Sequence, residues 1–243
     1  WVGYPAPSNG ASEMPVIGVF STDEEETEAC VKALESWDAG HLILPSGAGS
    51  RVDELTSGVD GLLITGRGDL APNWRPQERA PNSDCSWEAS GSSLLTAGLG
   101  IDLPILAIGR GFQLLNILLK GSLLSNVTAH SDESPETERG FTRHRIWISP
   151  GSKLANALGS GGRVRVTSSH GNGIREAQKS RRLLASAYSL EDGIIEALES
   201  PYHRWVLGVQ FHPEFSGQLP RQFQGIFGAL VDYAEGTRLE RST

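Results

Sequence analysis

Apolar positions in the first half of the chain form short runs separated by helical patterns. Four runs predict buried strands, at residues 15–20, 41–47, 59–72 and 104–116, the second, third and fourth of which break into turns. A Ser/Thr/Asp cluster at 21–23 with acidic residues behind it predicts a capped amphipathic helix, and 86–100 has the apolar spacing of another. Strands that alternate with helices predict a parallel sheet whose ligand sites lie at the carboxyl ends of the strands.

The second half of the chain has a different pattern. From about residue 122 the runs are short and often alternating, as in "HRIWIS", "RVRVTSSH", "LLASAYS", "GIIEALES" and "RWVLGVQF", which is typical of antiparallel or mixed pairing. An amphipathic helix at 218–236 closes the chain. We therefore predict an α/β three-layer sandwich, with a mostly parallel central sheet plus a small antiparallel sheet. It forms one domain over 15–243, after a flexible tail at 1–14.

Composition narrows the classes of function. The 243 residues carry a formal net charge of −8, which opposes a nucleic-acid surface, and the basic run at 179–182 is predicted to be a solvated loop. No apolar run reaches the roughly 20 residues of a membrane span. Two cysteines, Cys30 and Cys85, cannot form a disulfide framework and fit a reducing compartment, so we expect a cytoplasmic protein without a membrane partner.

The stretch "PILAIGRGFQLLN" (104–116) predicts a strand that turns sharply into a helix. Gly109 lies at the apex, and the small residues Ala107 and Gly111 flank it at the spacing that a nucleophile elbow requires. The following helix directs free N–H groups and its positive end at the apex, which favours negative charge there. The alternative is that these residues form a tight strand-to-helix turn that needs glycine and has no catalytic role.

A second candidate feature follows the last strand. In "VLGVQFHPEF" (206–215) the strand ends at His212, and Glu214 lies where its carboxylate can fix the imidazole tautomer. A strand-end histidine alone is more often structural. Together with the elbow and the "TGRGD" loop at 65–69, it completes the arrangement of nucleophile, base, orienting acid and oxyanion pocket.

Four ordered motifs carry a resemblance to a known family over nearly the whole chain. They are "DGLLITGRGDLAP", "PILAIGRGFQLLN", "HRIWISPGSKLANALG" and "LGVQFHPEF". The chain resembles the class I glutamine amidotransferase superfamily, whose fold is flavodoxin-like. Within it, the chain is similar to the γ-glutamyl hydrolase branch, peptidase family C26, which includes γ-glutamyl-γ-aminobutyrate hydrolases.

The resemblance implies a Cys-His-Glu triad that attacks a γ-glutamyl amide through a thioester. It implies that His212 is the base, that Glu214 orients it, and that the N–H groups of Gly68 and Arg110 are the oxyanion donors. Gly109 stands in the place of the nucleophile and cannot form an acyl-enzyme.

Other positions also depart from the family pattern. Arg67 replaces a glycine, Ala71 an acid, and Gly171 the second histidine of a pair whose first member is His170. Three unrelated changes around one pocket favour natural divergence over an engineered nucleophile, and both explanations remain open. Neither Cys30 nor Cys85 lies on a segment expected to supply a replacement nucleophile.

Arg67 beside Arg110 predicts a pocket that clamps a carboxylate or phosphate. Two alternatives are surface salt bridges made by both arginines, and neutralisation of Arg67 by Asp69. The candidate substrate-binding residues are Arg67, Gly66, Gln113 and His170, with Gln113 and Asn116 also able to buttress the turn. Glu88, Trp74 and Trp87 are candidates to support or flank the site. His144 is interpreted as a core polar group.

We expect no cofactor and no bound metal, because His41, His130 and His203 lack ligand spacing. Three functions remain open. The first is a non-thiol, pseudoenzyme-like member that binds a small amine- or carboxylate-bearing metabolite of γ-glutamyl, amino-acid or polyamine type. The second is a γ-glutamyl amide hydrolase with a substituted nucleophile, and the third is non-covalent acid–base chemistry by His212 and Glu214. A homodimer, or docking on a partner enzyme, is compatible with each.

Overall fold

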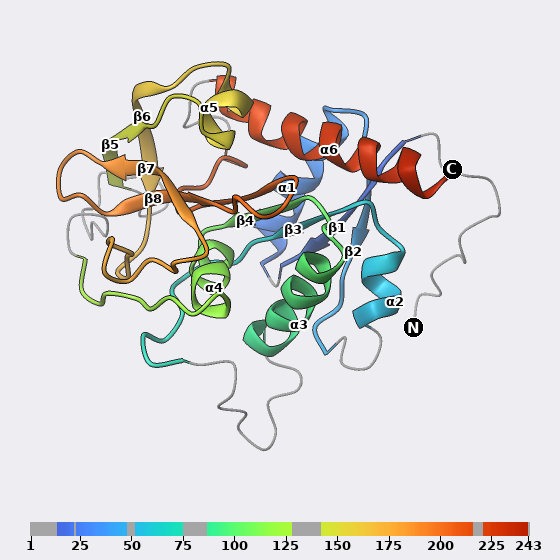
Figure 1. The fold of residues 1–243 in the computed structure, drawn as a ribbon, viewed down its shortest axis with the longest axis horizontal. Helices are drawn as coiled ribbons and strands as arrows, with labels where there is room; N and C mark the ends of the chain where they lie inside the picture. The colour runs from blue at the N-terminus through green and yellow to red at the C-terminus, as the bar shows by residue number, and fades with distance from the viewer. Residues whose placement is uncertain are drawn as a thin grey trace.

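The computed structural model describes residues 14–21, 23–47, 52–74, 87–127, 142–215 and 221–242 (Figure 1). Its strands are β1 Val16–Phe20, β2 Gly40–Ile43, β3 Gly61–Ile64, β4 Ile105–Ile108, β5 Thr142–Ile148, β6 Gly162–Ser168, β7 Leu184–Ser189, β8 Ile195–Glu199 and β9 Val206–Val209. Its helices are α1 Glu24–Glu35, α2 Val52–Ser57, α3 Trp87–Gly100, α4 Arg110–Leu118, α5 Lys153–Leu158, the 3-10 turn η5 Arg221–Gln224, and α6 Gly225–Arg241.

These strands form one sheet in the order β2-β1-β3-β4-β9-β8-β7-β5-β6. The first five are parallel, and β8, β7, β5 and β6 continue the sheet by antiparallel pairing. The α/β fold with both kinds of pairing is confirmed. The antiparallel strands do not form a separate small sheet, because β9 pairs with β4 on one side and with β8 on the other.

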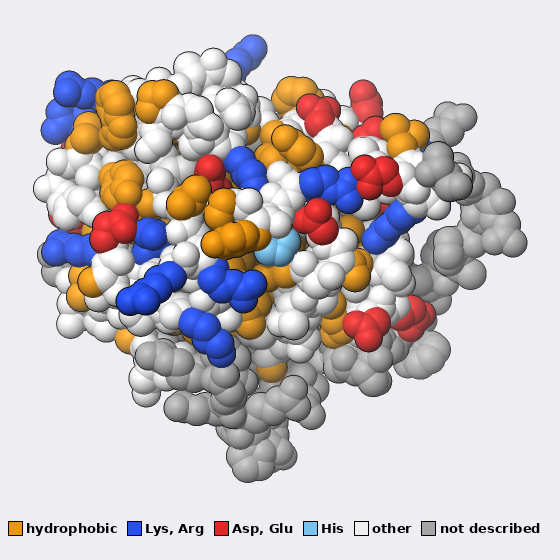
Figure 2. Space-filling model, in the orientation of Figure 1, with side chains coloured by type: hydrophobic (Ala, Val, Ile, Leu, Met, Phe, Trp, Pro, Cys, Tyr) orange, Lys and Arg blue, Asp and Glu red, His pale blue; other side chains and the backbone are white. Residues whose placement is uncertain are grey.

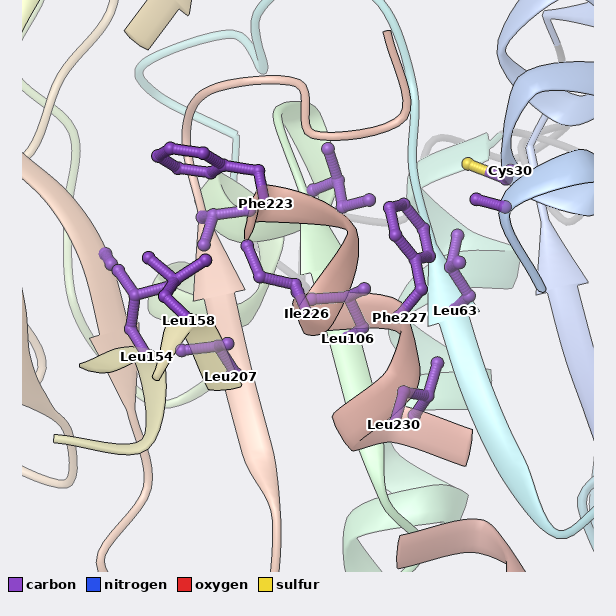
Figure 3. Close-up of a cluster of buried hydrophobic side chains, with 14 of the residues drawn as sticks. Cys30, Leu63, Leu106, Leu154, Leu158, Leu207, Phe223, Ile226, Phe227 and Leu230 are labelled. Carbon is purple, nitrogen blue, oxygen red and sulfur yellow. The ribbon is translucent and has the colours of Figure 1, made fainter. Parts of the chain in front are cut away.

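Helices cover both faces of the sheet, as the three-layer prediction requires (Figure 1). Side chains alternate along each strand, so Leu63 and Leu106 face a cluster with α1, α5 and α6, whereas Leu62 and Ile105 face a cluster with α2, α3 and α4. Figure 3 shows the first cluster, in which side chains from α6 and α5 gather against those of the strands. This packing fixes the carboxyl ends of β4 and β9 side by side.

Two short helices are absent from the sequence prediction. α2 and α5 have six residues each, too few for a helical period to stand out from the surrounding letters. α5 is bounded by specific ends, since the Ser152 hydroxyl accepts from the Ala155 N–H and Gly159 ends the helix at φ 75°.

Charge is unevenly spread over the face shown in Figure 2. Basic side chains are more numerous on the left, where Figure 1 places β5 to β8, and acidic ones on the right. Among the described helices, none combines the length and hydropathy needed to cross a bilayer. The predictions for Cys85, for His130 and for the flexible tail at 1–14, apart from Met14, lie outside the described residues, and the single domain over 15–243 stays a prediction.

Candidate active site

The elbow at Gly109 has the predicted geometry. Gly109 lies between β4 and α4 as the N-cap of the helix, at φ 56° and ψ −112°, a positive-φ conformation that favours glycine. Its N–H donates to the Val209 carbonyl at 2.9 Å, which ties the turn to β9. Gly111 is required for a different reason, since a β-carbon there would lie 2.2 Å from the Ile64 carbonyl oxygen.

The imidazole of His212 faces the elbow. A β-carbon built on Gly109 would lie 2.8 Å from Cε1 and 2.9 Å from Nε2 of His212. On the opposite side of the ring, Nδ1 is 2.6 Å from Glu214 Oε1, and both side chains are buried. Burial by itself lowers the pKa of His212, but the charge and hydrogen bond of Glu214 outweigh it, so the pKa is raised. The apex and the His–Glu pair therefore converge, as expected.

Glu26 is a residue of this site that the sequence prediction missed. It lies in the first turn of α1, three residues after the N-cap Asp23, whose carboxylate accepts from the Glu26 N–H at 2.9 Å. That spacing is typical of a capping box, in which the glutamate turns back to the N-cap. Instead its side chain is fully buried, with Oε1 3.8 Å from His212 Nδ1. Burial raises the pKa of Glu26 to about 7.

The expected pocket of two arginines is not formed. Arg67 points to α1, with Asp23, Glu25 and Glu26 at 3.5–4.0 Å. Arg110 pairs with Glu88 and lies 4.7 Å over the Trp87 ring. The salt-bridge alternative is the one observed, because each guanidinium has carboxylates of its own on a different helix.

The predicted oxyanion donors differ in their surroundings. The Arg110 N–H donates to the Gly66 carbonyl at 3.2 Å, so it is engaged within the protein. Gly68 is exposed in a left-handed conformation at φ 74°, with open space where a β-carbon would be. Gly66 is buried against Trp87, which leaves 3.1 Å for an added β-carbon. The oxyanion role of Gly68 and Arg110 stays a prediction.

Asp69 joins the loop after β3 to the loop after β6. Its Oδ2 accepts from the N–H groups of Gly171 and Asn172 at 2.7 and 3.0 Å, and its Oδ1 accepts from Gln113 at 2.5 Å. Gln113 in turn accepts from the Leu70 N–H at 2.9 Å. Asp69 therefore does not neutralise Arg67, and Gln113 acts as a buttress of the loop.

His170 belongs to a buried network rather than to an open surface. Its Nε2 is 3.5 Å from Glu196 Oε1, and His144 approaches the same oxygen at 3.4 Å. Burial opposes the charged forms, but the mutual hydrogen bonds and charges outweigh it. The pKa of Glu196 is therefore lowered and that of His170 raised. The interpretation of His144 as a core polar group agrees with its burial beside Glu196.

Cys30 lies on α1, one turn after Glu26, and is fully buried. Burial raises the pKa of its thiol well above the ordinary value, and the charges of Glu214 and Glu26 raise it further. A neutral buried thiol is a poor nucleophile. This supports the expectation that Cys30 does not replace a cysteine at the elbow.

Fold and site together define a glutamine amidotransferase-like α/β protein, with an elbow after one central strand and a His–Glu pair after its neighbour. The chain belongs to the peptidase C26 family, whose model matches residues 11–214.

Relatives agree with that assignment. A candidate glutamine amidotransferase of Schizosaccharomyces pombe is 30% identical over 83% of this chain and 79% of its own length. A candidate glutamine amidotransferase of Mycobacterium tuberculosis is 35% identical over 79% of this chain, which spans 60% of that protein. The γ-glutamyl-γ-aminobutyrate hydrolase of Escherichia coli K12 is 28% identical over 69% of this chain and 68% of its own length.

Solved structures share the fold. A candidate GMP synthase component from Thermoplasma acidophilum superposes with a TM-score of 0.69 at 17% identity, covering 96% of this chain and all of that one. The glutaminase domain of CTPS from Trypanosoma brucei gives 0.67 at 14% identity, covering 91% and 94%.

Proposed function

We propose that this chain is a peptidase C26 member without thiol chemistry at the elbow, and that it binds a small metabolite bearing an amine or a carboxylate. One observation carries the proposal. His212 occupies the space beside Gly109 in which a nucleophilic side chain would have to begin. A catalytic base needs to lie beside the nucleophile, about 2.6–3.2 Å from its reacting atom, and here the contact falls on the β-carbon position.

Two glutamates contact the His212 ring on the side that faces away from Gly109. Its Nδ1 lies 2.6 Å from Glu214, and Glu26 is packed on the same side, so a ring movement has to break a buried charge-assisted contact. If a cysteine at position 109 had merely been replaced by glycine, the space for its side chain would remain. The arrangement therefore favours divergence of the whole site over a single substituted nucleophile.

The ligand class follows from the chemistry that the site retains and from its relatives. α4 begins directly after the elbow, and His212 Nε2 faces the same place, so a polar group of a small ligand bound there would find a hydrogen-bond partner. The Escherichia coli relative is named for an amide between glutamate and γ-aminobutyrate. A γ-glutamyl compound or a related amino acid fits both observations.

The test combines an activity assay with a binding assay. We expect the purified chain to release no glutamate from γ-glutamyl-γ-aminobutyrate, while the same compound raises the melting temperature or gives heat in a calorimetric titration. His212→Ala should weaken this binding, and His41→Ala, at a distant surface position, should not. Glutamate release at the rate of an active family member would refute the proposal.

The substituted-hydrolase alternative predicts that Gly109→Cys restores glutamate release. The observed geometry opposes this, because the new β-carbon collides with His212. A folded and inactive Gly109→Cys protein would support divergence, and an active one would establish the alternative.

Acid–base chemistry without a nucleophile is favoured by the intact contact between His212 and Glu214. A positioned base typically contributes about 10²–10⁴-fold. This alternative requires turnover of some related metabolite that disappears in His212→Ala.

A further inference from the structure

We propose that Glu26, His212 and Glu214 bind a divalent metal ion of the zinc type at the contact between α1 and the turn after β9. This proposal does not depend on the proposed function, because it concerns metal binding without substrate. It uses Glu26, which the family resemblance does not assign.

The three side chains are close enough to share an ion. One ligand atom from each lies within 4.8 Å of the others. Tetrahedral zinc with bonds of about 2.0–2.2 Å separates its ligands by roughly 3.4 Å. The separations of His212 Nδ1 from Glu214 Oε1 and Glu26 Oε1, 2.6 and 3.8 Å, bracket this value. The third separation, between the two glutamates, is at most 4.8 Å, so the ion has to draw ligand atoms together by up to about 1.4 Å.

Two buried carboxylate oxygens are available to bind a cation. Glu26 Oε1 and Glu214 Oε2 are buried and accept no hydrogen bond from the described part of the chain. Both glutamate side chains are 0% exposed. A buried carboxylate oxygen without a partner is costly unless a proton or a metal neutralises it.

The guanidinium of Arg67 is not reserved for Glu26. Arg67 Nε lies 4.0 Å from Glu26 Oε1, beyond hydrogen-bond distance, and the Arg67 side chain is 45% exposed. The same guanidinium also faces Asp23 and Glu25, so one positive charge serves three carboxylates.

The ligand set selects the kind of metal. Imidazole favours zinc and its neighbours in the transition series, whereas Mg²⁺ prefers oxygen ligands and keeps several waters. A buried cluster with one imidazole leaves little room for those waters. Glu214 also borders a groove of about 820 Å³ between α1 and η5, which provides an entry path for the ion.

Metal binding changes the role of His212. A bound ion takes the Nδ1 lone pair, so the neutral ring releases the proton that Nδ1 shared with Glu214 and takes one up on Nε2, a change of tautomer with no net change in protonation. Nε2 faces Gly109. The ring then donates a hydrogen bond into the elbow instead of accepting a proton there.

The test uses the purified chain after chelation and dialysis, with Zn²⁺ alone as the probe. We expect one tight site by calorimetry and by metal analysis. Glu26→Gln should weaken it by more than about tenfold, whereas Glu28→Gln, the same change on an exposed position of α1, should leave it unchanged. Adventitious binding at His41 or His203 persists in both variants and is recognised by equal affinity.

Three results would overturn the proposal: no zinc bound, equal affinity in the two variants, or equally tight binding of Mg²⁺. Circular dichroism should show Glu26→Gln to be folded, because burying an amide costs less than burying a carboxylate. If that variant is unfolded, the wild-type chain loaded with Co²⁺ decides, since intense visible absorption indicates four ligands and weak absorption of a six-coordinate ion contradicts the site. The glutamate assay is run with chelator, so the two proposals fail separately.

Discussion

Nε2 of His212 lies 2.9 Å from the point where a β-carbon on Gly109 would be. Glycine at the apex and histidine in this position depend on each other, because any side chain at 109 has to displace the ring. The relationship has consequences for stability as well as for chemistry.

Gly109→Ala should destabilise the protein by about 2–4 kcal/mol, through strain at φ 56° and through the collision with His212. Gly68→Ala is the matched control, because it has φ 74° but open space around it, and should cost about 1 kcal/mol. Urea unfolding of both variants measures the difference. Equal losses would mean that the ring moves freely and that the site is not closed around glycine.

The network of Glu196 with His170 predicts a pH dependence. The lowered pKa of Glu196 gives stability that is present above about pH 4.5 and lost in more acid solution. The raised pKa of His170 gives stability that is present below pH 6.5 and lost as the pH rises through its folded value. The network therefore stabilises the fold most between these limits.

Glu196→Gln should cost roughly 3 kcal/mol at pH 6, and the cost should shrink towards pH 9. The measurement is the free energy of unfolding of wild type and variant across this range. Because His212 also has a raised pKa, only the difference between the two proteins reports on the network. A difference that does not change with pH would contradict the assignment.

Arg110 and Arg67 should differ in their contribution to stability. Arg110 stacks on Trp87 and pairs with Glu88, so Arg110→Ala should cost about 1–2 kcal/mol. Arg67 is nearly half exposed and its ion pairs are long, so Arg67→Ala should cost less than about 1 kcal/mol. Thermal unfolding of the two variants checks the order, and the reverse order would mean that Arg67 holds α1 in place.

Cys30 should be unreactive in the folded protein. In a Cys85→Ser background, a thiol reagent is expected to label Cys30 only at the rate of unfolding, because the thiol is buried and its pKa is raised. Mass spectrometry with and without urea gives the two rates. Rapid labelling of the native chain would revive Cys30 as a nucleophile.

The sequence alone was sufficient for much of the fold. β1, β3 and β4 are short apolar runs followed by turn or cap signals, and such local patterns determine where strands and helices lie. The small residues around Gly109 and the two-residue spacing of His212 and Glu214 are also local features of the sequence. The motifs in the chain therefore identified the family and located the elbow and the His–Glu pair, whose roles stay predictions.

Only the tertiary structure decided which distant groups meet. Glu26 has the spacing of a helix cap, but it is buried with its Oε1 3.8 Å from His212 Nδ1, a contact between α1 and the turn after β9 that no local pattern encodes. Arg67 and Arg110 are separated because each finds carboxylates on a different helix. The antiparallel strands extend the main sheet because β9 pairs with β4 along one edge and with β8 along the other. Pairing between strands far apart in the chain depends on packing rather than on the sequence of either strand.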